Sequence, residues 1–146
     1  GPVMLSWEDV AGAGESAVEG YNVVIHEFAH KIDLRDGAAD GCPPLPPGFM
    51  GHARSRDARA LWLATFDEAW QRFGRQVDAS DRFAGMVEPP WLDPYAGESI
   101  SEFFAVVVEA YFVNPVRLAL EFPTLMPLLD AFFAPGGPES QRGLRP

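Results

Sequence analysis

The feature that most constrains this chain is the segment His26-Glu27-Phe28-Ala29-His30, a His-Glu-x-x-His pattern. Residues four apart lie on one face of a helix, one turn above each other, so both imidazoles can reach a single metal ion. Glu27 stands beside them, where it can act on water bound to that ion. The same five-residue pattern also arises by chance on helices that bind nothing, so its surroundings must decide between the two interpretations.

The surroundings of the pattern are apolar. Residues 23–25 are Val-Val-Ile, and Phe28, Ala29 and Ile32 continue the run. A nearly buried helix is an unfavourable place for two histidines and a glutamate that bind nothing. We therefore expect a metal-binding helix with Asn22 as its N-cap, running to about Arg35, with Gly37 as the stop signal.

The overall composition limits the classes of partner. A length of 146 residues suits one domain, and an apolar share of 47% is enough for a core. The formal net charge is −10. Nucleic acid is therefore not expected as the main partner, nor is an anionic membrane surface, because both need a basic face. Peptides and small molecules remain possible.

The single cysteine, Cys42, bears on the compartment. One cysteine allows no internal disulfide, which fits a reducing environment. The first residues lack the basic segment and apolar run of a signal peptide, and no apolar run reaches 18 residues. We expect a cytoplasmic protein. Cys42, in a Pro-rich loop, and His52, in a polar stretch, are possible metal ligands, but we expect both to be incidental.

The remaining patterns predict a mainly α fold of the zincin-like (α+β) kind, with packing helices and at most a small β element near the N-terminus. That element is a possible edge strand at residues 3–7, which could either dock a peptide or only pack. We expect a metallopeptidase core over residues 1–133 and a flexible tail over residues 134–146. Residues 8–20 are expected to be mainly loop.

The second half of the chain shows further helical patterns. An apolar stripe predicts a packing helix over residues 57–76, capped by Ser55 or Asp57, followed by a loop to residue 94. Residues 100–113 are apolar nearly all round and predict a buried helix, with Ser99 and Glu102 as its capping box. A turn over residues 116–121 and a short helix over residues 123–133 follow.

A catalytic zinc usually has three protein ligands, so the two histidines need a partner. The buried helix over residues 100–113 is the best source, and it offers Glu102 and Glu109, which share a face. Glu102 could be occupied by the capping box, whereas Glu109 has no local role, and the residues alone do not decide between them. Asp33 is about 10 Å along the helix from His26, too far to bind the same ion. It could hold an imidazole from behind or be a solvated acid.

Several segments together carry a resemblance to a known family. They are residues 5–7 (Leu-Ser-Trp), 22–33 around the His-Glu-x-x-His pattern, 36–39 (Asp-Gly-Ala-Ala), 93–96 (Asp-Pro-Tyr-Ala), 101–106, 109–112 and 122–123. With these segments the chain resembles the Mlc titration factor A family of bacterial zinc-dependent peptidases, in which two histidines and a glutamate bind the metal in a gluzincin-like arrangement. Members of that family are longer than this chain.

The resemblance implies roles for individual residues. His26, His30 and Glu102 would bind one catalytic zinc ion, and Glu27 would be the general base. Tyr95 would lie near the reacting carbonyl and stabilise its negative charge; without the resemblance we would expect a turn aromatic that packs on the core. Glu109 would then orient a ligating histidine.

The resemblance also implies two functions. The first is a zinc metallopeptidase with aminopeptidase-type activity on short peptides. The second is a binding module that sequesters a transcriptional repressor, with little or no peptidase activity. The expected partners are therefore a peptide substrate and a repressor protein, and not nucleic acid or a membrane.

Overall fold

A computed structural model describes the backbone of residues 15–135 and the side chains of residues 22–135. Five α-helices make up most of this part of the chain: α2 (Glu15–Asp33), α3 (Ser55–Arg82), α4 (Ile100–Val113), α5 (Pro115–Glu121) and α6 (Met126–Phe133). Short 3-10 helices join them: η1 (Leu34–Asp36), η2 (Phe49–Gly51), η3 (Pro94–Gly97) and η4 (Pro123–Leu125). The mainly α prediction is confirmed.

Some predictions fall on parts of the chain that the structure does not describe. The expected strand at residues 3–7 lies outside the described residues, as does most of the expected tail. Between residues 15 and 135 no strand is present. The division into a core domain and a tail stays a prediction.

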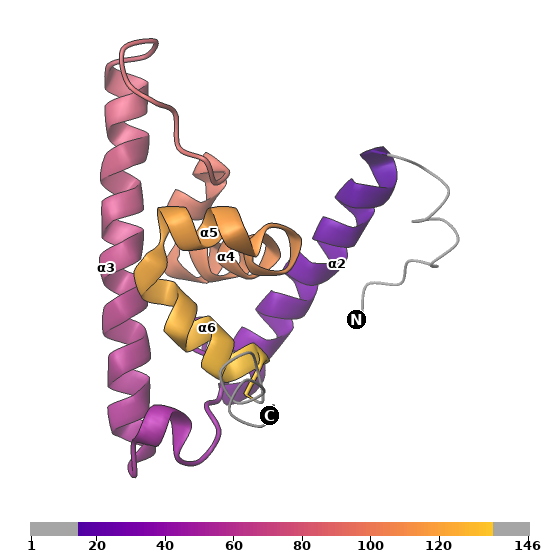
Figure 1. Ribbon diagram of the computed structural model, residues 1–146, viewed down its shortest axis with the longest axis vertical. Helices are drawn as coiled ribbons and strands as arrows, with labels where there is room; N and C mark the ends of the chain where they lie inside the picture. Colours follow the sequence, from indigo (N-terminus) through magenta and orange to yellow (C-terminus); the bar gives the residue numbers. More distant parts are fainter. Residues whose placement is uncertain (1–14, 136–146) are drawn as a thin grey trace, which may run out of the picture.

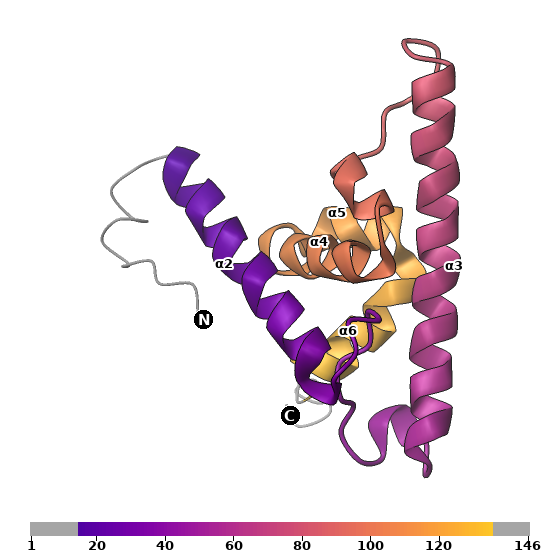
Figure 2. The same cartoon turned by 180° about the vertical axis from the view of Figure 1, so that it is seen from behind.

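The helices are arranged around α4 (Figure 1). The long helix α3 runs along one side of the molecule, α2 slants along the other, and α4 lies between them; Figure 2 shows the same order from behind. The pair α2 and α4 forms the most extensive helix–helix contact. This contact brings the His-Glu-x-x-His segment next to the helix that carries Glu102 and Glu109.

Helix α4 begins and ends where its sequence pattern predicts. Its six central residues, Phe103 to Val108, are buried, as expected for a helix that is apolar nearly all round. The Ser99 hydroxyl oxygen accepts a hydrogen bond from the backbone N–H of Glu102 at 3.1 Å, which caps the helix. Asn114 ends it, and Pro115 starts α5.

Aromatic side chains from α3 and α4 form the centre of the core. Trp62 stacks on Phe66 with ring centroids 4.9 Å apart, and Phe66 meets Phe103 edge to face at 6.3 Å. Phe73 and Phe122 extend the cluster towards α5. Such buried aromatic groups supply a large share of the hydrophobic stabilisation of a small domain, and here they fix α4 against α3.

The predicted start of the metal-binding helix was wrong. Helix α2 begins at Glu15, so Asn22 lies inside it and is not its N-cap, and residues 15–20 are helical instead of loop. Good helix formers in that segment outweigh the cost of Gly20, which is about 1 kcal/mol. The predicted stop is confirmed, because Gly37 adopts a left-handed φ of 88° after η1.

Helix α2 is also less buried than expected. Its inner face, with Ile25, Ala29 and Ile32, is buried, but Val23 and Phe28 are each 51% exposed. The apolar run over residues 23–32 therefore does not predict how much of the helix is buried. Only residues at helical spacing, Ile25, Ala29 and Ile32, lie on the buried face.

Helix α3 differs from its prediction at both ends. It runs to Arg82, so residues 77–82 are helical and the loop is shorter than expected. Gly85, in the loop after the helix, has a positive φ of 82°. At its start the N-cap position is Arg54, and no side chain caps it, so neither Ser55 nor Asp57 has the predicted role.

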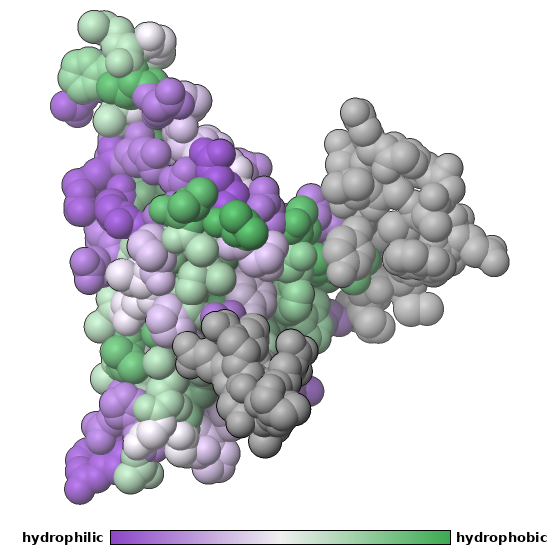
Figure 3. Space-filling view, in the orientation of Figure 1, coloured by the Kyte–Doolittle hydropathy of each residue, from purple (hydrophilic) through white to green (hydrophobic). Residues whose placement is uncertain are grey.

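Exposed apolar side chains lie on several elements, and the most exposed are on α5 and in the loop after α3 (Figure 3). On α5, Val116 and Leu120 are 74% and 75% exposed, and Met86, in the loop after α3, is 85% exposed. None of them belongs to the predicted site. No helix in the described part of the chain combines the length and apolarity needed to cross a membrane.

Cys42 lies at the start of the extended Pro-rich segment and is fully buried. Burial raises the pKa of its thiol to about 12. We predict that the folded protein reacts only very slowly with a thiol reagent at pH 8, because about one thiol in 10⁴ is then ionised and none is accessible. Reaction with Ellman's reagent, with and without 6 M guanidinium chloride, measures this. Fast labelling of the folded protein would contradict the buried position.

Candidate metal centre

Two helices bring the three predicted metal ligands together. His26 and His30 lie one turn apart on α2, and Glu102 lies in the first turn of α4. The Nε2 atoms of the two histidines are 3.1 Å apart. Glu102 reaches both, with Oε2 3.2 Å from His26 Nε2 and Oε1 3.0 Å from His30 Nε2.

These donor atoms fit a zinc ion. Tetrahedral coordination with bonds of about 2.0–2.1 Å places ligand atoms about 3.3 Å apart, close to the separations found here. Within the described residues, this is the group of His, Cys, Asp and Glu side chains able to hold a metal ion, and it includes neither Cys42 nor His52. The three side chains are 19–22% exposed, which leaves one side of the group open to water or substrate.

Glu109 occupies a different position from Glu102. Its Oε1 forms a short hydrogen bond with Nδ1 of His26, the ring nitrogen that faces away from the three-residue group. This hydrogen bond raises the pKa of His26, against the lowering effect of burial. A carboxylate on the outer nitrogen of a ligating histidine is the usual means of fixing its ring and tautomer.

Glu27 and Tyr95 line a pocket beside His26, and neither His30 nor Glu102 is among its lining residues. The pocket has a volume of about 280 Å³, and its walls are Asn22, Val23, His26, Glu27, Asp93, Tyr95, Val106 and Glu109. Tyr95 is 51% exposed and belongs to η3, whose first turn is capped because the Asp93 carboxylate accepts the Tyr95 N–H at 2.9 Å. Tyr95 is thus no core aromatic but a half-exposed residue in the wall of this pocket.

A larger hollow of about 510 Å³ lies between α3 and η3. Its walls include Trp70, Arg75 and Glu98, and none of the metal-binding candidates. Size alone would therefore select this hollow, whereas the smaller pocket is the one lined by a metal-binding candidate, His26.

Asp33 is neither a solvated acid nor in direct contact with an imidazole. It is fully buried, and its carboxylate accepts the N–H of Gly41 and, at 3.1 Å, the hydroxyl of Ser101. The Ser101 oxygen lies 3.4 Å from Nδ1 of His30. The sequence analysis missed Ser101, although its place beside Glu102 in the first turn of α4 was a signal that it faces α2.

Comparison with known proteins finds relatives of this chain. Mlc titration factor A of Serratia proteamaculans is 33% identical to this chain over 134 residues, as is that of Edwardsiella ictaluri. An uncharacterized protein of Synechocystis is 34% identical over 133 residues. Each match covers 91% of this chain but only 43–45% of the relative, so the chain spans less than half the length of these relatives. No solved structure matches.

A family model gives the same result over nearly the whole chain. Residues 1–134 match the model described as glucose-regulated metallo-peptidase M90. The match includes both helices of the candidate metal centre and the segment that carries Tyr95. The chain therefore belongs to the glucose-regulated metallo-peptidase M90 family.

Proposed function

We propose that this chain is a zinc metallopeptidase whose single zinc ion is held by His26, His30 and Glu102. The observation that carries the proposal is the convergence of their donor atoms, 3.0–3.2 Å apart, beside a pocket that also contains Glu27. Membership of a metallopeptidase family supports it. When bound, zinc supplies a Lewis acid and lowers the pKa of a coordinated water to about 7.

The protein's own groups then move protons and stabilise charge. The Glu27 carboxylate takes a proton from the attacking water and delivers it to the leaving amine. The Tyr95 hydroxyl donates a hydrogen bond to the carbonyl oxygen as negative charge develops there. Glu109 accepts a hydrogen bond from the Nδ1–H of His26, which leaves the Nε2 lone pair directed towards Glu102 and His30.

The chemistry of the pocket supports an aminopeptidase. Three carboxylates, those of Glu27, Asp93 and Glu109, line it together with the Asn22 amide, and no Lys or Arg is among the lining residues. An acidic pocket attracts a cationic group, and the cation that every unblocked peptide carries is its terminal ammonium. The volume of about 280 Å³ is small for a ligand pocket and favours short substrates.

The names of the relatives support a second candidate function. Proteins 33% identical to this chain are named as titration factors of Mlc. The corresponding proposal is that this chain binds a transcriptional repressor protein and hydrolyses little or no peptide. Both proposals place the chain in the cytoplasm, where the buried thiol of Cys42 would stay reduced.

The first prediction separates catalysis from binding. The wild-type chain should bind one zinc ion and hydrolyse an amino-acid anilide with a free amine, and a chelator should abolish turnover until zinc is restored. Glu27→Gln should keep the zinc but lose about 10²–10⁴-fold in kcat, since the general base is gone. Metal analysis and anilide turnover measure the two properties.

Two results would contradict this assignment. Turnover retained in Glu27→Gln would rule out the general base. Stoichiometric zinc without any turnover would favour the repressor-binding function, with the full-length Serratia relative assayed in parallel as the longer control.

The second prediction concerns the acidic pocket. Asp93→Asn keeps an oxygen that can cap η3 but removes a negative charge, so KM for a free-amine substrate should rise several-fold while kcat changes little. Glu98→Gln is the matched control, because Glu98 lies just beyond η3 and outside this pocket. Equal KM values for Asp93→Asn and wild type would exclude Asp93 from amine recognition.

The third prediction distinguishes the two glutamates of α4. Glu102→Gln should lose zinc binding almost completely, because a ligand is removed. Glu109→Gln should weaken zinc binding by about 10–100-fold while keeping one ion per chain, because only the support of His26 is lost. Competition with a chromogenic chelator measures both. The reverse order of effects would show that Glu109 is the third ligand.

A further inference from the structure

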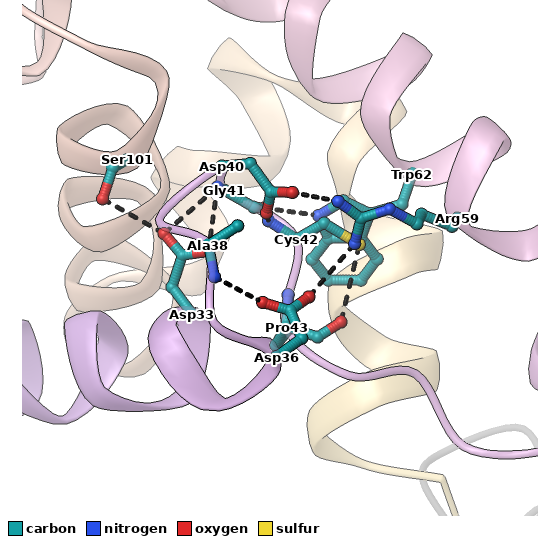
Figure 4. Close-up of polar contacts among 10 residues, drawn as sticks. All are labelled: Asp33, Asp36, Ala38, Asp40, Gly41, Cys42, Pro43, Arg59, Trp62 and Ser101. Carbon is teal, nitrogen blue, oxygen red and sulfur yellow. Dashed lines mark hydrogen bonds and ion pairs between the residues drawn. The ribbon is translucent and has the colours of Figure 1, made fainter.

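We propose that Asp33 and Ser101 form a positioning chain that holds His30 in the tautomer with its Nε2 atom free for the metal. The proposal rests on the metal centre proposed above and adds two residues to it. Figure 4 shows Asp33 at the end of α2, with Gly41 and Ser101 on either side of its carboxylate.

The position of Asp33 is costly for a charged residue. Among the described side chains it is the one buried charged group, and burial raises the pKa of its carboxyl. It also lies in the last turn of α2, where the helix dipole disfavours negative charge. No cation in the described part of the chain pairs with it, since Arg59 pairs with Asp36 and Asp40 instead. Packing alone does not explain an acid at this place.

The hydrogen bonds around Asp33 are all donated towards its carboxylate. The backbone N–H of Gly41 donates to Oδ1 at 2.9 Å and lies 3.1 Å from Oδ2. The Ser101 hydroxyl donates its only proton to Oδ2 at 3.1 Å. The Ser101 oxygen, 3.4 Å from Nδ1 of His30, can then only accept, so this contact is a hydrogen bond in the tautomer that carries the ring proton on Nδ1. The Nε2 lone pair is left pointing at Glu102 and His26.

The loop that follows α2 holds Asp33 in place. The carbonyl of Gly41 accepts the indole N–H of the buried Trp62, on α3, at 2.7 Å. Gly41 has a φ of +79°, and a Cβ there would lie 3.1 Å from the Ile100 side chain and 3.2 Å from its carbonyl oxygen. The loop therefore fits closely against the start of α4, and the chain of contacts joins α2, α3 and α4.

The two histidines are thus supported in different ways. Glu109 contacts Nδ1 of His26 directly, whereas Asp33 acts on Nδ1 of His30 through the Ser101 hydroxyl. Both arrangements direct Nε2 inwards. Since Ser101 precedes Glu102, one turn of α4 supplies both a candidate ligand and the support of another.

Three variants and one control variant test the proposal. Ser101→Ala should lower zinc affinity about 10-fold or more, and Ser101→Thr, which keeps the hydroxyl, should stay within about threefold of wild type. Asp33→Asn should have the largest effect, because its NH₂ group would donate to Ser101 and turn the serine proton towards His30. Asp36→Asn removes a charge from the neighbouring loop without touching Ser101, and it should leave zinc affinity unchanged.

The decisive readout is the tautomer of His30, which a merely structural role would not change. Imidazole ¹⁵N chemical shifts of the folded metal-free chain at pH 8 should show Nδ1–H in wild type and Ser101→Thr. They should show mixed tautomers in Ser101→Ala and mainly Nε2–H in Asp33→Asn. Thermal melts of the same samples establish whether each variant is folded. Ser101→Ala tests the positioning role of Asp33 and Ser101 even if Asp33→Asn does not fold.

The outcomes separate this inference from the proposed function, because neither measurement needs turnover. Unchanged tautomers and zinc affinity in Ser101→Ala would overturn the positioning chain while leaving the metal centre intact. A wild-type chain that binds no zinc would overturn the metal centre and with it the positioning chain. A protein whose variants bind zinc with the expected order of affinities, but which hydrolyses nothing, would support the positioning role of Asp33 and Ser101. The same result would contradict the proposed peptidase activity.

Discussion

The structure depends on the packing of α2 against α4. This contact places two imidazole nitrogens and a carboxylate within 3.2 Å of one another, at the point where both helices present their polar residues. Lone pairs that converge in this way repel one another unless a proton or a cation lies between them. The hydrophobic core holds them there, since Phe104, two residues after Glu102 on α4, packs against Trp62 and Phe66 of α3. Core packing and the candidate site are thus parts of one arrangement.

The polar groups around the site are ordered from the outside inwards. Glu109 and Ser101 contact the outer nitrogens of the histidines, and Asp33 lies behind Ser101. Buried polar networks stabilise one arrangement only when each member has its partner, and here the backbone of Gly41 and the indole of Trp62 complete the set. The catalytic candidates Glu27 and Tyr95 line a pocket next to His26 and Glu109, where a substrate could enter. Supported ligand side chains next to an accessible pocket suit a catalytic site better than a closed structural one.

Much of this could be predicted from sequence, for identifiable reasons. The spacing of His26 and His30, and the apolar pattern of residues 100–113, depend on local helix geometry, and both predictions agree with the structure. The choice between Glu102 and Glu109 could not be made from the residues, because seven-residue spacing puts both on the same face of α4; it needed the resemblance, and the different ring nitrogens that they reach depend on how α2 crosses α4. Ser101 was missed because its contact with Nδ1 of His30 also depends on how α2 crosses α4. The predicted start of α2 and the predicted end of α3 were wrong, because a loop signal such as Gly20 is weak against a run of good helix formers.

The central claim is that one metal ion is bound between α2 and α4 by two histidines and Glu102. Anomalous diffraction at the zinc edge, from a crystal of the zinc-loaded chain, tests it most directly. We predict one strong peak within about 2.0–2.2 Å of His26 Nε2, His30 Nε2 and a Glu102 oxygen, with the remaining position open to the pocket. A peak coordinated by Glu109, or one closed by a fourth protein ligand such as Cys42 or His52, would contradict the account.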